Sequence, residues 1–274
     1  MKPAPFRYHR PATPAEAWET LAAEMRLGSG AKVLAGGQSL VPLLSMRLAS
    51  PPALVDINAV AGLDAIEVRD EGVYVGALVR HADLLASTEA RLVQPLLAQA
   101  LLHVAHPTIR NRGTSVGSLV HADSAAELPA VLALLGGSLE VGSVRGTRTI
   151  GAADLFVGPL ESSLAPDELA VGALFPALPV GAGVAFGEIA RRHGDYALCG
   201  VAALVEGDLV KAAYLSVSDV PTVVDLTGVA DEDLGEAALE HLDPAGDIHA
   251  TADYRAHLVR VLTTKVVREA REAA

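Results

Sequence analysis

The chain has 274 residues, of which 51% are hydrophobic and 20% charged, so it is globular and long enough for two or three compact units. Its 21 lysines and arginines against 33 aspartates and glutamates give a formal net charge of -12, which excludes the basic surface that nucleic-acid binding needs. One cysteine, Cys199, excludes an internal disulfide and any iron–sulfur cluster or cysteine zinc site made by this chain alone.

The N-terminal segment predicts no targeting or membrane function. Residues 1–9 contain no apolar signal core, and no uninterrupted apolar run approaches the ~20 residues of a membrane span. We therefore expect a cytoplasmic protein without membrane insertion.

A strand and a helix open the chain. The pattern predicts a strand over 6–9, followed by Thr13-Pro14-Ala15-Glu16, which has the form of a capping box with proline at the first helical position. Apolar residues then recur at helical spacing until Gly28 and Gly30, which end the helix.

A glycine-rich turn follows the next strand. The strand is predicted over 31–34, the turn is Ala35-Gly36-Gly37-Gln38-Ser39-Leu40, and a helix runs from Leu40 to Met46. Adjacent glycines leave consecutive N–H groups free to face an anion. This turn therefore predicts a diphosphate cradle.

The middle of the chain contains a second glycine-bearing turn. A hairpin is predicted over 66–76 and a helix over 92–104, and the turn Arg110-Asn111-Arg112-Gly113-Thr114-Ser115-Val116-Gly117-Ser118 comes next. Hydroxyl groups accompany both turns, and neither has the Gly-x-Gly-x-x-Gly spacing of a dinucleotide fingerprint. We expect the two turns to close over the same ligand.

A helix from a capping box at Ser124-Ala125-Ala126-Glu127 to Leu135 follows, stopped by glycines. Pro129 should lie beyond its first turn and cost a backbone hydrogen bond to Ala125. This inconsistency indicates either a functional constraint nearby or a distorted helix end. Strands are predicted over 138–141 and 147–150.

The pattern of apolar residues changes near residues 164–168, and we place a domain boundary there. Short apolar runs at 170–174, 197–205 and 210–217 predict an antiparallel sheet, and helices are predicted over 231–241 and 252–270.

One short motif points to another enzyme class. Gly113 to Gly117 formally satisfies the Gly-x-Ser-x-Gly nucleophile elbow, which would make Ser115 a hydrolase nucleophile with Asp195 and either His241 or His249 as partners. That motif requires an apolar strand before it and a helix directly after it, and the sequence predicts neither. The hydrolase is therefore a minor alternative.

Other polar clusters give weaker signals. His103, His106 and His121 have one nearby carboxylate, Asp123, so we predict no metal site. No convincing general acid–base pair is present. The cluster 191–196 ends in a Gly-Asp turn that would fix where Tyr196 projects, either as a surface feature or beside a planar ring system.

Several blocks in the right order resemble the FAD-binding medium subunit of the molybdenum hydroxylases, the group that includes aerobic carbon monoxide dehydrogenase and the xanthine dehydrogenases. The likeness covers nearly the whole chain. The blocks are Phe6-Arg7-Tyr8-His9-Arg10-Pro11, Ala35-Gly36-Gly37-Gln38-Ser39-Leu40, Ile109-Arg110-Asn111-Arg112-Gly113-Thr114, His121-Ala122-Asp123, Ala190-Arg191-Arg192-His193-Gly194-Asp195-Tyr196-Ala197 and Tyr254-Arg255-Ala256-His257-Leu258.

The resemblance implies an α+β fold: a two-lobed FAD-binding domain of the vanillyl-alcohol-oxidase (PCMH) type over 1–166, with lobes of about 1–57 and 58–166, then a C-terminal domain over 167–274. It implies that both turns embrace the FAD diphosphate, that Asp123 lies near the ribityl or diphosphate region, and that Tyr196 lies beside the isoalloxazine. The implied FAD-binding residues are Lys32, Val33, Leu34, Ala35, Gly36, Gly37, Gln38, Ser39, Leu40, Ile109, Thr114, Gly117, Ser118 and Asp123.

The second turn departs from the family pattern Gly-Thr-Ile-Gly-Gly-Ser at Val116, which replaces the first glycine of the pair. If this position needs a positive φ, the β-branched side chain is strained by roughly 1 to 3 kcal/mol. We then expect either weaker FAD binding or a shifted path in which Ser115 supplies a hydroxyl.

The resemblance also implies a function. The chain would pass electrons from 2Fe-2S clusters on a small subunit through FAD to a quinone, NAD or oxygen, while a large molybdenum-pterin subunit oxidises the substrate, in a dimer of heterotrimers. The alternatives are a stand-alone FAD-dependent oxidoreductase of the same fold and a non-catalytic assembly subunit with impaired FAD binding.

Overall fold

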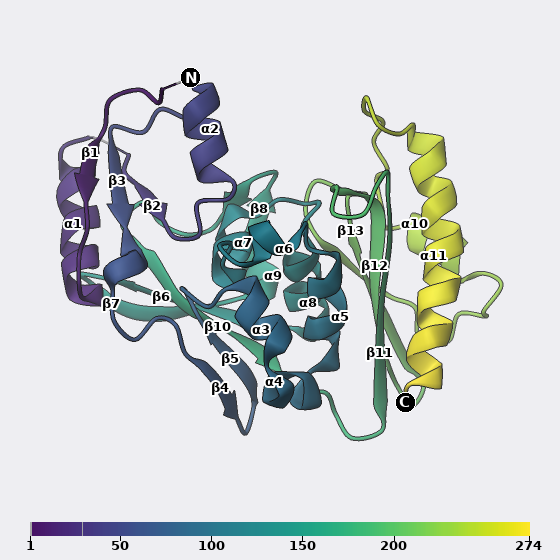
Figure 1. Cartoon of the computed structure of the whole chain (residues 1–274). Coiled ribbons are helices and arrows are strands. Elements are labelled where there is room, and N and C mark those ends of the chain that lie inside the picture. The colour runs from purple at the N-terminus through teal and green to yellow at the C-terminus, as the bar shows by residue number, and fades with distance from the viewer. Residues whose placement is uncertain (1, 29) are drawn as a thin grey trace.

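The computed structural model describes residues 2–28 and 30–274, and three parts lie side by side in it (Figure 1). We call them lobe one (residues 2–28 and 30–59), lobe two (60–178) and the C-terminal part (179–274). Lobe two lies in the middle, and its helices face the sheet of the C-terminal part.

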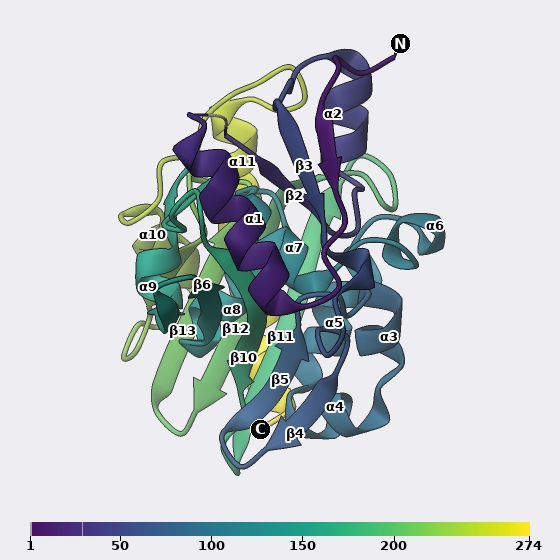
Figure 2. The ribbon, with the colours of Figure 1, turned by 90° about the vertical axis from the view of Figure 1, so that its left-hand side faces the viewer.

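Lobe one is a small parallel sheet between two helices (Figure 2). The predicted cap is confirmed, because Thr13 Oγ1 accepts from Glu16 N at 3.2 Å and Pro14 is the first helical residue. The strand order is β1-β3-β2. The elements are β1 (Arg7–His9), α1 (Pro14–Arg26), β2 (Lys32–Leu34), α2 (Leu40–Met46), β3 (Ala53–Asp56) and the 3-10 helix η1 (Ile57–Ala59).

Lobe two is an antiparallel sheet in the order β4-β5-β10-β6-β7, with helices packed against it. Its strands are β4 (Ile66–Arg69), β5 (Gly72–Gly76), β6 (Ser138–Ser143), β7 (Gly146–Gly151), β8 (Phe156–Gly158), β9 (Glu161–Ser162) and β10 (Leu169–Pro176). Its helices are α3 (His81–Ala86), α4 (Thr88–Val93), α5 (Pro95–His103), α6 (Pro107–Arg110), α7 (Ser115–His121), α8 (Glu127–Leu135) and α9 (Ala152–Leu155).

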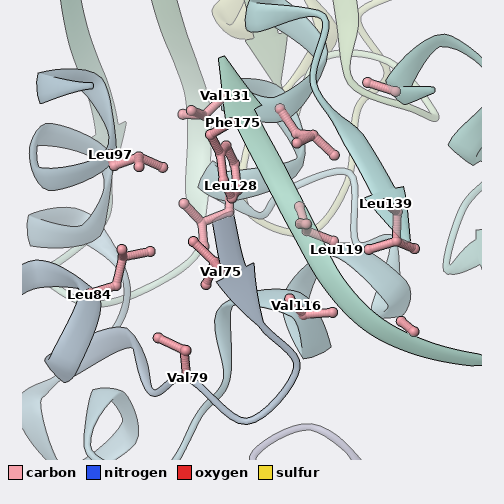
Figure 3. Packing of buried hydrophobic residues seen from close by; sticks show 14 of the residues in the cluster. Val75, Val79, Leu84, Leu97, Val116, Leu119, Leu128, Val131, Leu139 and Phe175 are labelled. Carbon is pink, nitrogen blue, oxygen red and sulfur yellow. The ribbon is translucent and has the colours of Figure 1, made fainter. Parts of the chain in front are cut away.

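The main core lies between this sheet and its helices (Figure 3). Phe175 of β10 is fully buried, and Leu119 of α7 and Leu128 of α8 are also closed to solvent. Burying side chains of this size stabilises the fold by about 1.5 to 3 kcal/mol each.

Strand β10 corrects the predicted organisation. We expected 170–174 in the C-terminal sheet, but β10 pairs with β5 on one side and β6 on the other. An apolar run buried on both faces is typical of a central strand, and its sequence does not say which sheet it joins. The sheet of lobe two therefore continues to Pro176.

The C-terminal part is a four-stranded antiparallel sheet covered by a long helix. Tyr214 is fully buried in the separate core of this part, and its hydroxyl lies 2.9 Å from Thr263 Oγ1. The elements are β11 (Ala182–Ala190), β12 (Ala197–Glu206), β13 (Leu209–Leu215), β14 (Thr222–Asp225), α10 (Leu234–Leu239) and α11 (Ala252–Glu272). None of the helices formed by the described residues is both long and apolar enough to cross a membrane.

The start of α8 differs from the prediction. The helix begins at Glu127 with Ala126 as its N-cap, so the predicted capping box is wrong. Pro129 is the third helical residue, where a backbone N–H has no intrahelical acceptor. The expected loss of a hydrogen bond does not occur, and Pro129 gives no sign of a functional constraint.

Candidate functional site: the junction of two glycine turns

The two glycine turns, far apart in the sequence, lie against each other where lobe one meets lobe two. A Cβ atom added to Gly36 would lie 2.5 Å from Arg112 O, 2.8 Å from Gly113 Cα and 2.9 Å from Thr114 N. Only glycine permits this approach. The loop between β2 and α2 accordingly reaches towards α6 and α7 (Figure 1).

The first turn connects β2 to α2. Gly37 has a φ of 71°, in the left-handed region that favours glycine. The Gln38 amide folds back and donates to Gly36 O at 2.9 Å. Ser39 is the N-cap of α2, and its hydroxyl makes no capping bond within that helix. Of the predicted ligands here, Lys32 is exposed, and Val33, Leu34, Ala35, Gly36, Gly37, Gln38, Ser39 and Leu40 are half-buried.

The second turn is the start of a helix. Thr114 is the N-cap of α7, and its buried hydroxyl accepts from Gly117 N at 3.2 Å. Ile109 is half-buried, and its carbonyl accepts from Gly113 N at 2.7 Å. Gly117 and Ser118 are half-buried. Thr114 therefore shapes this turn, since its hydroxyl is already used for capping.

Val116 does not need a positive φ. It is the second residue of α7 with a helical backbone, and its side chain is 1% exposed in the core of lobe two (Figure 3). The predicted strain is wrong, because the family pattern alone could not show that this position is helical. Val116 supports the second turn through packing.

Three arginines create a local positive potential in this acidic chain. Arg80, at the start of α3, pairs by a backbone bridge with Thr114. Its pKa is lowered by burial and by the neighbouring charge of Arg112. Arg110 donates to the carbonyls of Val104 and Ala105 at 2.7 and 2.9 Å. An anion at this junction would relieve repulsion between the cations.

His81 is part of the same region and was missed in the sequence. Its side chain is buried, with 5% of the residue exposed, and its backbone N–H donates to Gly113 O at 3.0 Å. Burial, and then the charge of Arg110, lower its pKa to about 4, so the imidazole is neutral at pH 7. The only sign of this site in the sequence is the polar pair Arg80-His81, which directly follows the apolar run 77–79.

The hydrolase interpretation is wrong, because the Ser115 hydroxyl is closed to solvent and substrate. Ser115 has no exposed surface, and its Oγ lies 3.3 Å from His81 Nδ1. A helix does begin at Ser115, contrary to the prediction, but the short helix α6 precedes it where an elbow needs a strand. A substrate cannot reach this hydroxyl.

Tyr196 and Asp123 line one cavity of about 950 Å³ between lobe two and the C-terminal part. Gly194, with a φ of 81°, places the loop against His106, whose ring would be 2.5 Å from an added Cβ. Tyr196 is 67% exposed, and partial burial together with the carboxylates of Asp123 and Glu127 raises its pKa. The loop 191–196 therefore brings the predicted aromatic residue to the predicted ribityl-side carboxylate.

Glu127, the first residue of α8, makes stability depend on pH. Burial, then the charge of Glu188, raises its pKa from 4.5 to about 8. The folded state then holds a proton that the unfolded chain releases, so Glu127 lowers the free energy of unfolding as pH rises from 4.5 to 8, while the neutral His81 raises it between pH 4 and 6.5. We expect Glu127→Gln to remove the contribution of Glu127 to the pH slope and to stabilise the protein at pH 8 by about 4 kcal/mol relative to wild type.

Urea unfolding of both proteins across this pH range measures the effect. Glu206→Gln, at an exposed position at the end of β12, is the matched control and should leave the slope unchanged. Equal slopes for wild type and Glu127→Gln would contradict a protonated Glu127.

Two of the histidines that we considered as metal ligands have other neighbours. His103 Nδ1 lies 3.4 Å from Glu188 Oε1, and the rings of His106 and His193 are 6.1 Å apart. Among the described residues, no group of three or more His, Cys, Asp or Glu side chains could hold a metal ion.

Comparison with known proteins identifies the family of the chain. A family described as "FAD binding domain in molybdopterin dehydrogenase" matches residues 4–178. The chain is 40% identical to the nicotine 6-hydroxylase medium subunit of Paenarthrobacter nicotinovorans, over 98% of this chain and 99% of the relative. It is 41% identical to the 6-hydroxypseudooxynicotine dehydrogenase complex subunit alpha of the same organism, over 89% of this chain and 88% of the relative.

Solved structures agree. A chain of carbon monoxide dehydrogenase from Hydrogenophaga pseudoflava superposes with a TM-score of 0.93 at 30% identity, covering 100% of both chains. A chain of quinoline 2-oxidoreductase from Pseudomonas putida 86 superposes with a TM-score of 0.90 at 34% identity, covering 99% of both. These matches confirm the resemblance seen in the sequence. The chain therefore belongs to the FAD-binding family of the molybdopterin dehydrogenases.

Proposed function

We propose that this chain is the flavoprotein subunit of a heteromeric molybdenum hydroxylase and that the junction of the two turns holds the diphosphate of FAD. The observation that carries the proposal is the contact of Gly36 with the backbone of Arg112 and Gly113. It brings the half-buried residues 33–40 of the first turn close to the second turn, of which residues 110–112 and 117–118 are exposed or half-buried. Three arginines lie beside this junction, which suits a diphosphate in a chain of net charge -12.

The residues divide by role. The first turn, from Lys32 to Leu40, would line one side of the diphosphate, and Ile109, Gly117 and Ser118 the other, with Thr114 holding the second turn in shape. Asp123 would face the ribityl or diphosphate region, and Tyr196 would lie beside the isoalloxazine. Bound FAD accepts electrons singly and releases them singly or in pairs, so this chain has only to bind, orient and shield it.

Partner chains follow from what this sequence lacks. With one buried cysteine, Cys199, the chain cannot ligate an iron–sulfur cluster by itself. The relatives are named as subunits of complexes. We infer a small iron–sulfur subunit that delivers electrons and a large molybdenum-pterin subunit that oxidises the substrate, in a dimer of heterotrimers.

The domain limits are part of this proposal. We place the FAD-binding domain in lobes one and two and the subunit's second domain in the C-terminal part. A boundary after β10, in place of the predicted one at 166, keeps the five-stranded sheet whole.

Visible absorbance of the purified full chain tests FAD binding. We expect flavin bands, either as isolated or after addition of FAD, because the junction is formed by this chain alone. Absence of flavin in both cases would overturn the proposal. A stand-alone oxidoreductase would oxidise substrate by itself, whereas a subunit should co-purify with a molybdenum protein and an iron–sulfur protein.

A further inference from the structure

A line of hydrogen bonds connects the two turns across the boundary between the lobes. Asn58 Nδ2 donates to Ala35 O at 2.8 Å, and Asn58 Oδ1 accepts from Arg80 Nη2 at 2.7 Å. Arg80 Nη1 donates to Arg112 O at 2.6 Å. The line therefore runs from the first turn through one side chain of each lobe to the second turn.

The chemistry of the line fixes the residue type at position 58. The carbonyl oxygens of Ala35 and Arg112 can only accept, and the guanidinium of Arg80 can only donate. The group between them must donate on one side and accept on the other. An amide does both, whereas the nearly isosteric carboxylate of aspartate lacks the donor.

The Asp56 carboxylate holds the side chain of Asn58 in place. Asp56 Oδ1 accepts from Asn58 N at 3.0 Å and from Asn58 Nδ2 at 2.6 Å, and Asp56 Oδ2 accepts from the Tyr8 hydroxyl at 2.5 Å. Burial would raise the pKa of Asp56, but the hydrogen bonds from Tyr8 and Asn58 hold it below its ordinary value. The ionised carboxylate keeps Asn58 turned towards Ala35.

The backbone of Arg80 is tied to the second turn. It forms an antiparallel bridge with Thr114, flanked by His81 N to Gly113 O at 3.0 Å and Ser115 N to Val79 O at 3.1 Å. Arg80 therefore moves with the second turn, while its side chain reaches lobe one.

We propose that Asn58 and Arg80 are positioning residues that hold the two lobes at the spacing at which both turns contact one diphosphate. The inference rests on the proposed function. It adds that the affinity for the diphosphate also depends on two residues that lie outside both turns. Arg80 hydrogen-bonds two neutral oxygens, Asn58 Oδ1 and Arg112 O, so its charge also remains available to the anion.

Equilibrium binding of FAD, ADP and riboflavin to the flavin-free full chain tests the role. We expect Asn58→Asp to weaken FAD and ADP binding about tenfold or more, because it removes the donor to Ala35 O and places a second carboxylate beside Asp56. Riboflavin, which has no phosphate, should bind as in wild type. The thermal midpoint without flavin should stay within about 2 °C.

Two substitutions of Arg80 separate charge from geometry. Arg80→Gln removes both and should weaken ADP binding most. Arg80→Lys keeps the charge but cannot bridge two acceptors as a guanidinium does, so it should fall between wild type and Arg80→Gln. Arg260→Gln and Arg260→Lys, at an exposed ion pair with Glu236, are matched controls and should bind ADP as wild type does.

The outcomes distinguish the two proposals. If the wild-type chain binds neither FAD nor ADP, the proposed function fails. If wild type binds both and Asn58→Asp binds them equally well, or Arg80→Lys matches wild type, the positioning role is wrong while the flavoprotein assignment stands. Equal losses for FAD, ADP and riboflavin would also overturn it, since they would indicate general damage to the fold.

Discussion

Substituting Gly36→Ala should weaken FAD binding about 10- to 100-fold while the chain stays folded. The new methyl group would lie 2.5 Å from Arg112 O and 2.8 Å from Gly113 Cα, which are backbone atoms that cannot rotate away. Relieving such overpacking typically costs about 1 to 3 kcal/mol, and each 1.4 kcal/mol changes affinity about tenfold. The two turns would separate, and the diphosphate would lose contacts with one of them. Titration of the flavin-free chain with FAD measures the loss.

Gly151→Ala is the matched control. Gly151 caps α9, and nothing lies within 4 Å of an added Cβ there. Its FAD affinity should equal that of wild type. If Gly36→Ala also binds FAD with wild-type affinity, the close approach of the turns is not part of the cofactor site.

Substituting Val116→Gly should destabilise the protein by about 3 kcal/mol and should not improve FAD binding. The valine side chain is buried among the core residues of lobe two, and removing it costs about 2 kcal/mol or more. Glycine inside a helix adds about 1 kcal/mol. For a chain of this size the thermal midpoint should fall by about 10 °C.

Val116→Ala separates the two terms, because alanine leaves the cavity but favours the helix. It should lose about 2 kcal/mol, and both variants should bind FAD normally at temperatures where they remain folded. A large gain in FAD affinity for Val116→Gly would instead show that this position is strained in the native protein.

Much of the site could be predicted because local chemistry determines it. The strand before Ala35, the left-handed Gly37 and the Thr13 cap follow from rules that operate over a few residues. The pairing of the two turns was predicted from their glycines and hydroxyl groups, and the family resemblance then implied FAD as their ligand. Most of the elements predicted for lobe one rest on these local signals.

The rest depends on contacts that no short window contains. Asn58 and Arg80 are unremarkable polar residues until the fold places them between two carbonyls. Val116 could be placed in a helix only once the backbone of α7 was known, since a family motif records residue types and not backbone angles. The sheet that β10 joins could not be predicted either, because its apolar run would fit either sheet.

The position of β10 sets an order on folding. The hairpins β4–β5 and β6–β7 pair strands that are close in sequence, and such local contacts favour early formation. They become one sheet only when β10, the last strand of lobe two to leave the ribosome, enters between β5 and β6. Until then the inner edges of β5 and β6 are unpaired, so the sheet that supports the proposed site is complete only after β10 has been synthesised.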